Sequence, residues 1–179
     1  MSNLRLLDEQ SISSSVSTFS VPDVFTSDFD IYQITATDLS TTGTTSTEVW
    51  LRFINAGGGV NVTSSYEYGG RYFLAWSTTS DLNGQNQSGI RRCFAEATDQ
   101  SPEVASSTIW VFNPYSSTEY TSLLFETSNY YGGTYASQMK GFAYLKRLES
   151  ITGFHAYDNN GSRPLASGTF RTYGLRVDS

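Results

Sequence analysis

Two segments near the C-terminal end alternate between the two sides of an extended chain, and this pattern constrains the fold more than any other feature. In residues 151–157 and again in residues 167–177, aromatic and β-branched side chains recur with a period of two. That period is typical of β-strands. The link between the segments contains Asn160-Gly161, which supplies the positive φ angles of a tight turn. We therefore predict a closing β-hairpin whose last strand pairs centrally in its sheet.

Further strand-like segments are separated by short stretches rich in Gly, Asn, Ser and Pro. They are residues 30–36, 48–54, 107–112, 122–128 and 136–144. The first two, with the Ser/Thr/Gly loop between them, predict an antiparallel hairpin. No segment shows a helix-length period of 3.6. Strands at this spacing predict an all-β fold with little helix, a single antiparallel two-sheet sandwich of the jelly-roll or concanavalin-like type.

Two stretches of the predicted sandwich are less regular. The aromatic-rich residues 66–76 suit either a short helix or a wide loop, and the pattern does not choose between them. The polar residues 77–89 predict an exposed loop. The glycine-rich residues 55–59 lack the flanking residues of a phosphate-binding loop, so they predict a plain turn.

Residues 1–20 predict an N-terminal arm or an edge strand, ahead of a sandwich domain at residues 21–179. Leu4, Leu6 and Leu7 form an apolar patch before a serine-rich link. This patch either makes oligomer or attachment contacts on a neighbouring subunit or adds an edge strand to its own sheet. The N-terminus lacks the apolar core of a signal peptide, so we expect assembly in the cytoplasm.

The charge balance excludes one class of partner and favours another. The net charge is −6, which argues against nucleic acid because phosphates require a basic surface. No apolar run is long enough to cross a membrane. Only two lysines are present, so Ser, Thr, Asn and Gln must supply most of the polar surface. Burying such groups costs less than burying charges, which suits packing against neighbouring proteins.

No catalytic, cofactor or metal site is predicted. One histidine and one cysteine exclude a structural zinc site. His155 lies within a regular strand, and Cys93 is expected to be a buried thiol. Residues 158–162 space oxygen ligands as a calcium loop does but lack its bidentate Glu, so a hairpin turn is favoured. Glu119 and Glu126 have no spacing that marks a glycosidase pair.

Aromatic clusters are the candidate binding residues, because tyrosine and tryptophan rings can stack on sugars. The candidates for glycan stacking are Tyr66, Tyr68, Tyr72, Trp76, Tyr130 and Tyr131.

The order of segments is similar to that of a known group of virion proteins. It runs from residues 27–32 through 49–53 and 66–68 to 151–154, and it ends with Ser-Gly-Thr and Tyr-Gly-Leu in residues 167–175. This order resembles the concanavalin-like or jelly-roll domains in structural proteins of tailed bacteriophages, including those of marine and cyanobacterial hosts. The resemblance covers the chain from about residue 19 onward and rests on short motifs.

The resemblance implies a non-enzymatic virion structural protein. The sequence has no heptad stalk for trimerisation, which favours a capsid decoration or accessory protein over a tail fibre. The alternative is a tail-fibre, baseplate or receptor-binding domain that recognises carbohydrate. The expected partners are further copies of the chain in a homotrimer, the major capsid protein or tail proteins, and a host-surface glycan. The expected location is the virion.

Overall fold

The computed structural model describes residues 3–131, 133 and 135–175, which form two antiparallel β-sheets and no helix. No helix of these residues could therefore span a membrane. The large sheet has the strand order β1 (Leu4–Ile12), β12 (Leu165–Leu175), β3 (Ile31–Thr41), β8 (Ala105–Phe112), β9 (Thr121–Tyr131), β10 (Tyr135–Leu145), β5 (Tyr66–Leu74) and β6 (Ser80–Gln87). The small sheet has the order β2 (Thr18–Val21), β11 (Ile151–Asp158), β4 (Thr47–Asn55) and β7 (Glu96–Ala97).

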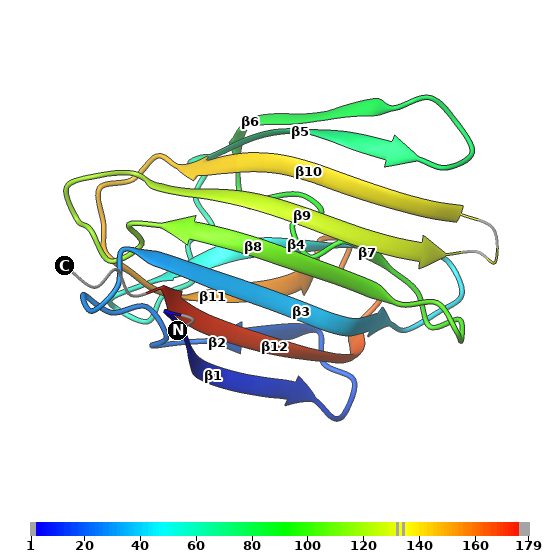
Figure 1. Ribbon diagram of the computed structural model, residues 1–179, viewed down its shortest axis with the longest axis horizontal. Coiled ribbons are helices and arrows are strands. Elements are labelled where there is room, and N and C mark those ends of the chain that lie inside the picture. The colour runs from blue at the N-terminus through cyan, green and yellow to red at the C-terminus, as the bar shows by residue number, and fades with distance from the viewer. Residues whose placement is uncertain (1–2, 132, 134, 176–179) are drawn as a thin grey trace.

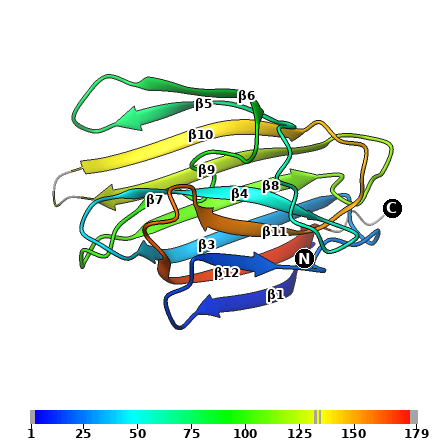
Figure 2. The ribbon, with the colours of Figure 1, turned by 180° about the vertical axis from the view of Figure 1, so that it is seen from behind.

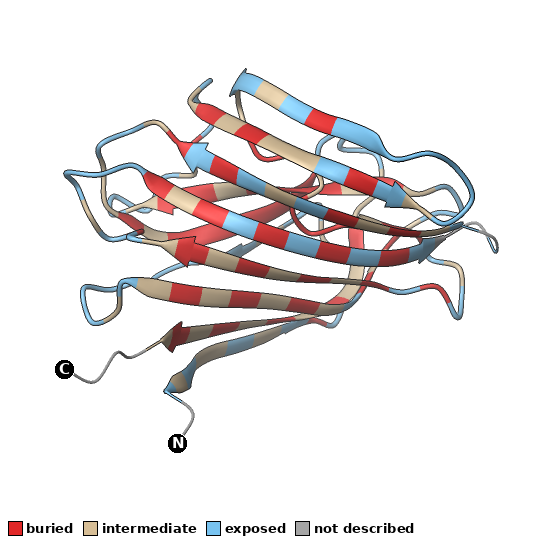
Figure 3. Ribbon diagram, turned by 45° about the horizontal axis from the view of Figure 1, so that its top comes forward, coloured by how far each residue is buried: buried red, intermediate tan, exposed pale blue. Residues whose placement is uncertain are grey.

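The two sheets form a sandwich, so the predicted fold class is confirmed. The large sheet lies in front in Figure 1, and the small sheet lies in front in Figure 2, which is the view from behind. Alternation decides which side chains enter the core. In β8, for example, Ser107, Ile109 and Val111 are buried while the residues between them are partly exposed. Figure 3 shows the same alternation along β3, β9 and β12 of the large sheet.

Aromatic rings from both sheets meet in the core. The ring centroids of Phe154 on β11 and Phe170 on β12 lie 6.1 Å apart. Phe94, from the segment between β6 and β7, packs edge-on against Phe170 with centroids 5.3 Å apart. All three side chains are fully buried or nearly so. Because full burial of such a side chain contributes about 1.5–3 kcal/mol, this cluster holds the two sheets together.

Two predicted hairpins are wrong, although their strands are present. β3 and β4 lie in different sheets, and so do β11 and β12. Their links, residues 42–46 and 159–164, cross from one sheet to the other. Five extended residues can span about 17 Å, and packed sheets lie about 10 Å apart, so a short polar link fits either arrangement. β12 does have a strand on each side, as predicted.

Residues 66–76 and 77–89 contain paired strands, so the loop predicted over residues 77–89 is wrong at residues 80–87. β5 pairs with β10 on one side and with β6 on the other. β6 is the outermost strand of the large sheet on this side. Only Leu82 of β6 is buried, which is why its sequence lacks the usual alternation. Residues 55–59 form the predicted turn.

Residues 4–21 belong to the sandwich. β1 pairs with β12 at one edge of the large sheet, and β2 pairs with β11 at an edge of the small sheet. Leu4 and Leu7 are half-buried, and Leu7 packs against the core. Leu6 is 49% exposed. The edge-strand interpretation is therefore confirmed for β1, while a contact of these leucines with a neighbouring subunit stays a prediction.

Candidate functional site

The outer face of the large sheet, which points away from the small sheet, carries a band of apolar side chains. Strand register places Tyr173, Gln33, Trp110, Leu124 and Phe142 in one row across five strands. The next row adds further apolar residues. The apolar band thus consists of Ile31, Trp110, Phe112, Leu124, Phe142, Tyr144, Tyr173 and Leu175. Contiguous exposed apolar surface of this kind marks interaction sites in soluble proteins.

The most exposed part of the apolar band lies on β9 and β10. The exposed fractions are 52% for Leu124, 49% for Phe142 and 45% for Tyr144. The Phe142 ring lies over Gly69 of the neighbouring strand, where an added Cβ would come within 3.0 Å of the ring. Gly69 therefore lets a large ring lie flat on the sheet, and a side chain at this position would lift the ring away.

The same face is hollowed along strands β8 and β9, and the hollows overlap the apolar band at Trp110, Leu124 and Tyr173. Three hollows of about 690, 500 and 300 Å³ lie on this face. The middle hollow shares Ser106, Ser128 and Gln138 with the largest and Thr108 and Glu126 with the smallest. The hollows therefore adjoin one another along the two strands, and we call them together the trough. Its central lining combines Arg171 and the Tyr173 ring with outward-facing polar side chains, which are Thr35, Thr37, Ser106, Thr108, Glu126, Ser128 and Gln138.

Charged side chains on the outer face are paired with one another. Lys140 Nζ lies 3.0 Å from Glu126 Oε1, and Arg171 Nε lies 2.6 Å from Glu9 Oε2. Two further pairs, Arg71 with Asp81 and Lys146 with Glu67, lie toward the β5–β6 edge. Four acidic and four basic groups cancel, so these pairs leave the face neutral although the chain carries a net charge of −6.

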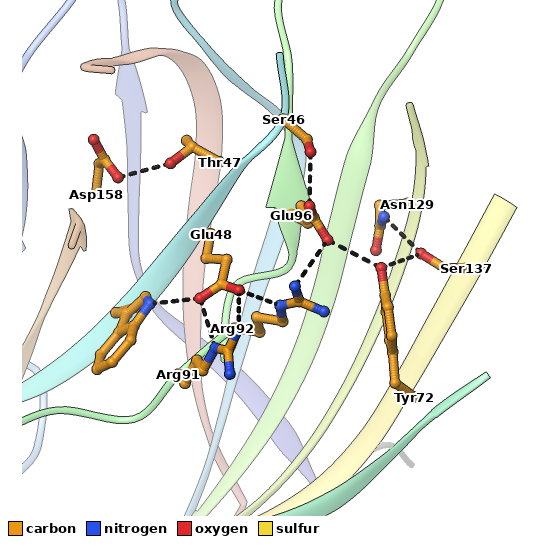
Figure 4. Close-up of polar contacts among 11 residues, drawn as sticks. Ser46, Thr47, Glu48, Tyr72, Arg91, Arg92, Glu96, Asn129, Ser137 and Asp158 are labelled. Atoms are coloured by element: carbon orange, nitrogen blue, oxygen red, sulfur yellow. Dashed lines mark hydrogen bonds and ion pairs between the residues drawn. The ribbon is translucent and has the colours of Figure 1, made fainter. Parts of the chain in front are cut away.

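A polar network lies at the opposite side of the large sheet, between it and the edge of the small sheet (Figure 4). At its centre, Glu48 on β4 accepts two hydrogen bonds from Arg91, at 2.6 and 2.7 Å, and one of 2.7 Å from Arg92. Trp50 Nε1 donates a fourth, at 3.2 Å. Burial alone would raise the pKa of Glu48, but the two guanidinium groups outweigh it and lower the pKa.

The network continues through Glu96 into the large sheet. Glu96 Oε1 accepts a hydrogen bond from Ser46, and its Oε2 accepts one of 3.0 Å from the Tyr72 hydroxyl. The Tyr72 oxygen also lies 3.0 Å from Ser137 Oγ. Arg92 Nη2 lies 3.5 Å from Glu96 Oε2, so it bridges the two carboxylates. The network ties the two sheets together.

The histidine and the cysteine occupy structural positions. His155 Nδ1 lies 2.8 Å from Ser20 Oγ on the adjacent strand β2. Burial and then the charge of Arg52 lower the pKa of His155, so it stays neutral. No carboxylate hydrogen-bonds to His155 within the described part of the chain, so the pair lacks the third member of a catalytic triad. Cys93 is buried, as predicted, and burial raises its pKa well above the usual value.

The Asp158 loop is a turn that uses its own oxygen atoms. The Asp158 carboxylate accepts backbone hydrogen bonds from Asn160, Ser162 and Arg163 and one of 2.7 Å from Thr47 Oγ1. Burial would raise the pKa of Asp158, but these donors lower it. Its oxygens are thus engaged, which favours the predicted turn over a calcium loop. The described residues contain no group of three or more His, Cys, Asp or Glu side chains that could hold a metal ion.

The predicted glycan-stacking residues divide into buried and exposed groups. Tyr66, Tyr68 and Tyr72 point into the core and are at most 7% exposed, so the prediction is wrong at these three positions. They alternate with polar or small residues on β5, and this period places them inside. Trp76 and Tyr130 are 41% and 43% exposed. The side chain of Tyr131 lies outside the described residues.

The trough and the apolar band contain residues that the sequence did not single out. Trp110, Leu124 and Phe142 come from three strands and meet only through the strand register. Trp110 and Leu124 each lie between two buried residues of their own strand, and Phe142 precedes buried Ala143, so alternation is the available sequence signal. Tyr130 is the one predicted aromatic that lines the trough.

Comparison with known proteins identifies no family. No family model matches the chain, and no curated protein matches it. A solved xylan β-1,4-xylosidase from Bacillus halodurans C-125 aligns with 80% of this chain at 8% identity and a TM-score of 0.27, and the chain spans only 27% of that enzyme. The exoplasmic/lumenal domain of VIP36 aligns with 96% of this chain and 84% of its own length, at 8% identity and a TM-score of 0.28. The infectious bursal disease virus VP2 subviral particle aligns with 98% of this chain and 41% of its own, at 8% identity and a TM-score of 0.16.

Proposed function

We propose that this chain is a non-enzymatic structural protein of a tailed-bacteriophage particle and that the outer face of the large sheet is its contact surface. The observation that carries the proposal is the apolar band, because a sheet face that exposes Leu124, Phe142 and Tyr144 gains by being covered. Full burial of an exposed side chain contributes about 1.5–3 kcal/mol, and covering one of these half-buried side chains contributes about half of that. The resemblance to phage virion domains agrees with this role.

Within the particle, the first candidate is an accessory protein that decorates the capsid. The apolar band would then pack on the major capsid protein, and several copies, three in the expected homotrimer, would sit side by side. The second candidate is a tail or baseplate domain that recognises a host-surface glycan. The trough favours this second candidate, because hydroxyl and amide groups there lie between aromatic rings.

Mass spectrometry of purified particles tests the proposal directly. We expect the chain among the particle proteins, at a copy number that separates a capsid site from a tail site. The double variant Leu124→Ser, Phe142→Ser should melt at the same temperature as the parent but incorporate less into particles. Absence of the chain from particles, with the parent present in the infected cell, would rule the proposal out.

A further inference from the structure

We propose that the trough binds a neutral glycan, a chain of several sugar rings that lies along β8 and β9 between Trp110 and Tyr130. This inference rests on the second candidate of the proposed function, the glycan-recognising tail or baseplate domain, since it names the ligand of that surface. It commits the surface to carbohydrate and makes packing on another protein, as in the first candidate, the competing outcome.

The shape of the trough fits an extended ligand. Register pairs Trp110 with Leu124, Thr108 with Glu126 and Ser106 with Ser128 along the two strands. Six residues of strand separate Trp110 from Val104 at the other end, a length of about 20 Å at 3.3–3.4 Å per residue. The three adjoining hollows have volumes in the range of small-molecule sites. A linear oligosaccharide can occupy such a path, whereas a single small metabolite would fill only one hollow.

The floor of the trough offers the hydrogen bonds that sugars need. A sugar ring presents hydroxyl groups that both donate and accept. The hydroxyls of Thr35, Thr108, Ser106 and Ser128 do the same, and the Gln138 amide adds a donor and an acceptor. Gln138 Nε2 donates to Glu126 Oε1 at 2.5 Å, which fixes the orientation of the amide. The floor can therefore bind hydroxyl groups without any large rearrangement.

Aromatic rings at both ends of the trough complement the apolar faces of sugar rings. Trp110 lines one end, and Tyr130 with Phe73 lines the other. The Tyr130 hydroxyl donates a hydrogen bond of 2.9 Å to the Gly133 carbonyl, which holds the phenol ring in place. Tyrosine and tryptophan combine a flat apolar face with a polar edge, which suits a ligand with both kinds of surface.

The charges around the trough favour a neutral ligand over an acidic one. Arg171 and Lys140 are the cationic groups nearest the floor, and each forms an ion pair, with Glu9 and Glu126 respectively. An acidic polysaccharide would have to displace these carboxylates and would meet the net negative charge of the chain. A neutral glycan leaves both ion pairs intact.

The full chain should be tested on an array of neutral and acidic glycans, and the best neutral glycan should then be measured by calorimetry. Tyr130→Ala should weaken binding about tenfold through loss of a stacking ring. Thr108→Val, which keeps the branched shape and removes one hydroxyl, should weaken binding by a smaller factor. The matched control is Tyr115→Ala, at 41% exposure against 43% for Tyr130, on a loop outside the trough. Its affinity should equal that of the parent.

Three results would overturn the inference: no binding of any neutral glycan, binding of acidic glycans alone, or equal affinity for the parent and Tyr130→Ala. A fourth is a stable dimer in sedimentation that Leu124→Ser, Phe142→Ser dissociates, because the face would then bind a second copy. These outcomes are separate from the proposed function. Glycan binding by a protein absent from particles contradicts the virion role, while a particle protein that binds no glycan contradicts only this inference.

Discussion

Glu48 and its two arginines make the stability of this protein depend on pH. The arginines lower the pKa of Glu48 below its ordinary value of 4.5. A lowered pKa in the folded state means that ionised Glu48 stabilises the fold above pH 4.5. This contribution is lost as the pH falls through the folded-state pKa. The network joins β4 to the segment after β6, so its loss loosens one end of the small sheet.

We predict that Glu48→Gln lowers the free energy of unfolding by about 1–3 kcal/mol at pH 7, since hydrogen bonds to a charged group are lost. The difference from the parent should shrink below pH 4.5, where the parent carboxylate also becomes protonated. Urea unfolding at pH 7 and near pH 3 measures this directly. Equal differences at both values would mean that shape, and not charge, is what Glu48 contributes.

Gly153 on β11 allows close approach of the neighbouring strand. A Cβ at this position would lie 2.3 Å from the Val21 carbonyl oxygen and 2.8 Å from Pro22 Cα. Both are backbone atoms, so the strands would have to separate. We predict that Gly153→Ala lowers the free energy of unfolding by about 1–3 kcal/mol. Gly59→Ala is the control, because its Cβ would meet only Asn55 side-chain atoms, the nearest at 3.5 Å. Thermal melts of both variants test the prediction. An equal decrease in melting temperature for Gly153→Ala and Gly59→Ala would contradict it.

At the scale of single residues, the sequence predicted more of the core than of the surface. Phe170 and Thr172 alternate with partly exposed neighbours and are buried, as a period of two requires. The same rule, applied to β5, places Tyr66 and Tyr68 inside, which contradicts their assignment to glycan stacking. Aromatic content alone does not distinguish a core ring from a binding ring.

At the scale of elements, the sequence located most strands but did not determine how they pair. A polar link such as residues 42–46 has the same composition whether it closes a hairpin or crosses between sheets. Whether the link closes a hairpin or crosses between sheets depends on which partner strands cover β3 and β4. β4 has buried residues on both of its faces, so its sequence does not show the alternation of a strand with one solvent-exposed face. β6 could not be found by alternation, because it is an edge strand whose residues are largely exposed. The strand register that brings the trough residues together depends on pairing between segments. A pattern within one segment therefore does not predict it.

Edge strand β1 provides an element-scale prediction. It covers the free side of β12 along eight paired positions. We predict that deletion of residues 1–12 lowers the melting temperature and exposes the β12 edge to pairing with other chains. Calorimetry and size-exclusion chromatography measure the two effects. An unchanged melting temperature with lost particle binding would instead make these residues the attachment segment.

At the scale of the whole molecule, β12 determines whether the large sheet can form as one continuous sheet. It is the strand that joins β1 to β3. We predict that a chain ending at residue 164 gives no cooperative thermal unfolding transition, because both neighbours lose their partner and Phe170 leaves the core. Near-ultraviolet circular dichroism during heating, with the full chain as the reference, measures this. A sharp transition in the shortened chain would show that the remaining strands fold independently.

The position of β12 also affects synthesis. A ribosome releases the N-terminal strands first, at about 5–20 residues per second. β1 and β3 therefore emerge long before β12, and until β12 arrives each has an open side that can pair with another nascent chain. Many copies translated together on one messenger would meet in this unfinished state. Slow translation just before residue 165 would prolong the exposure, whereas rapid translation of the last strand would shorten it. The yield of soluble protein should therefore depend on codon choice in and just before the β12 segment.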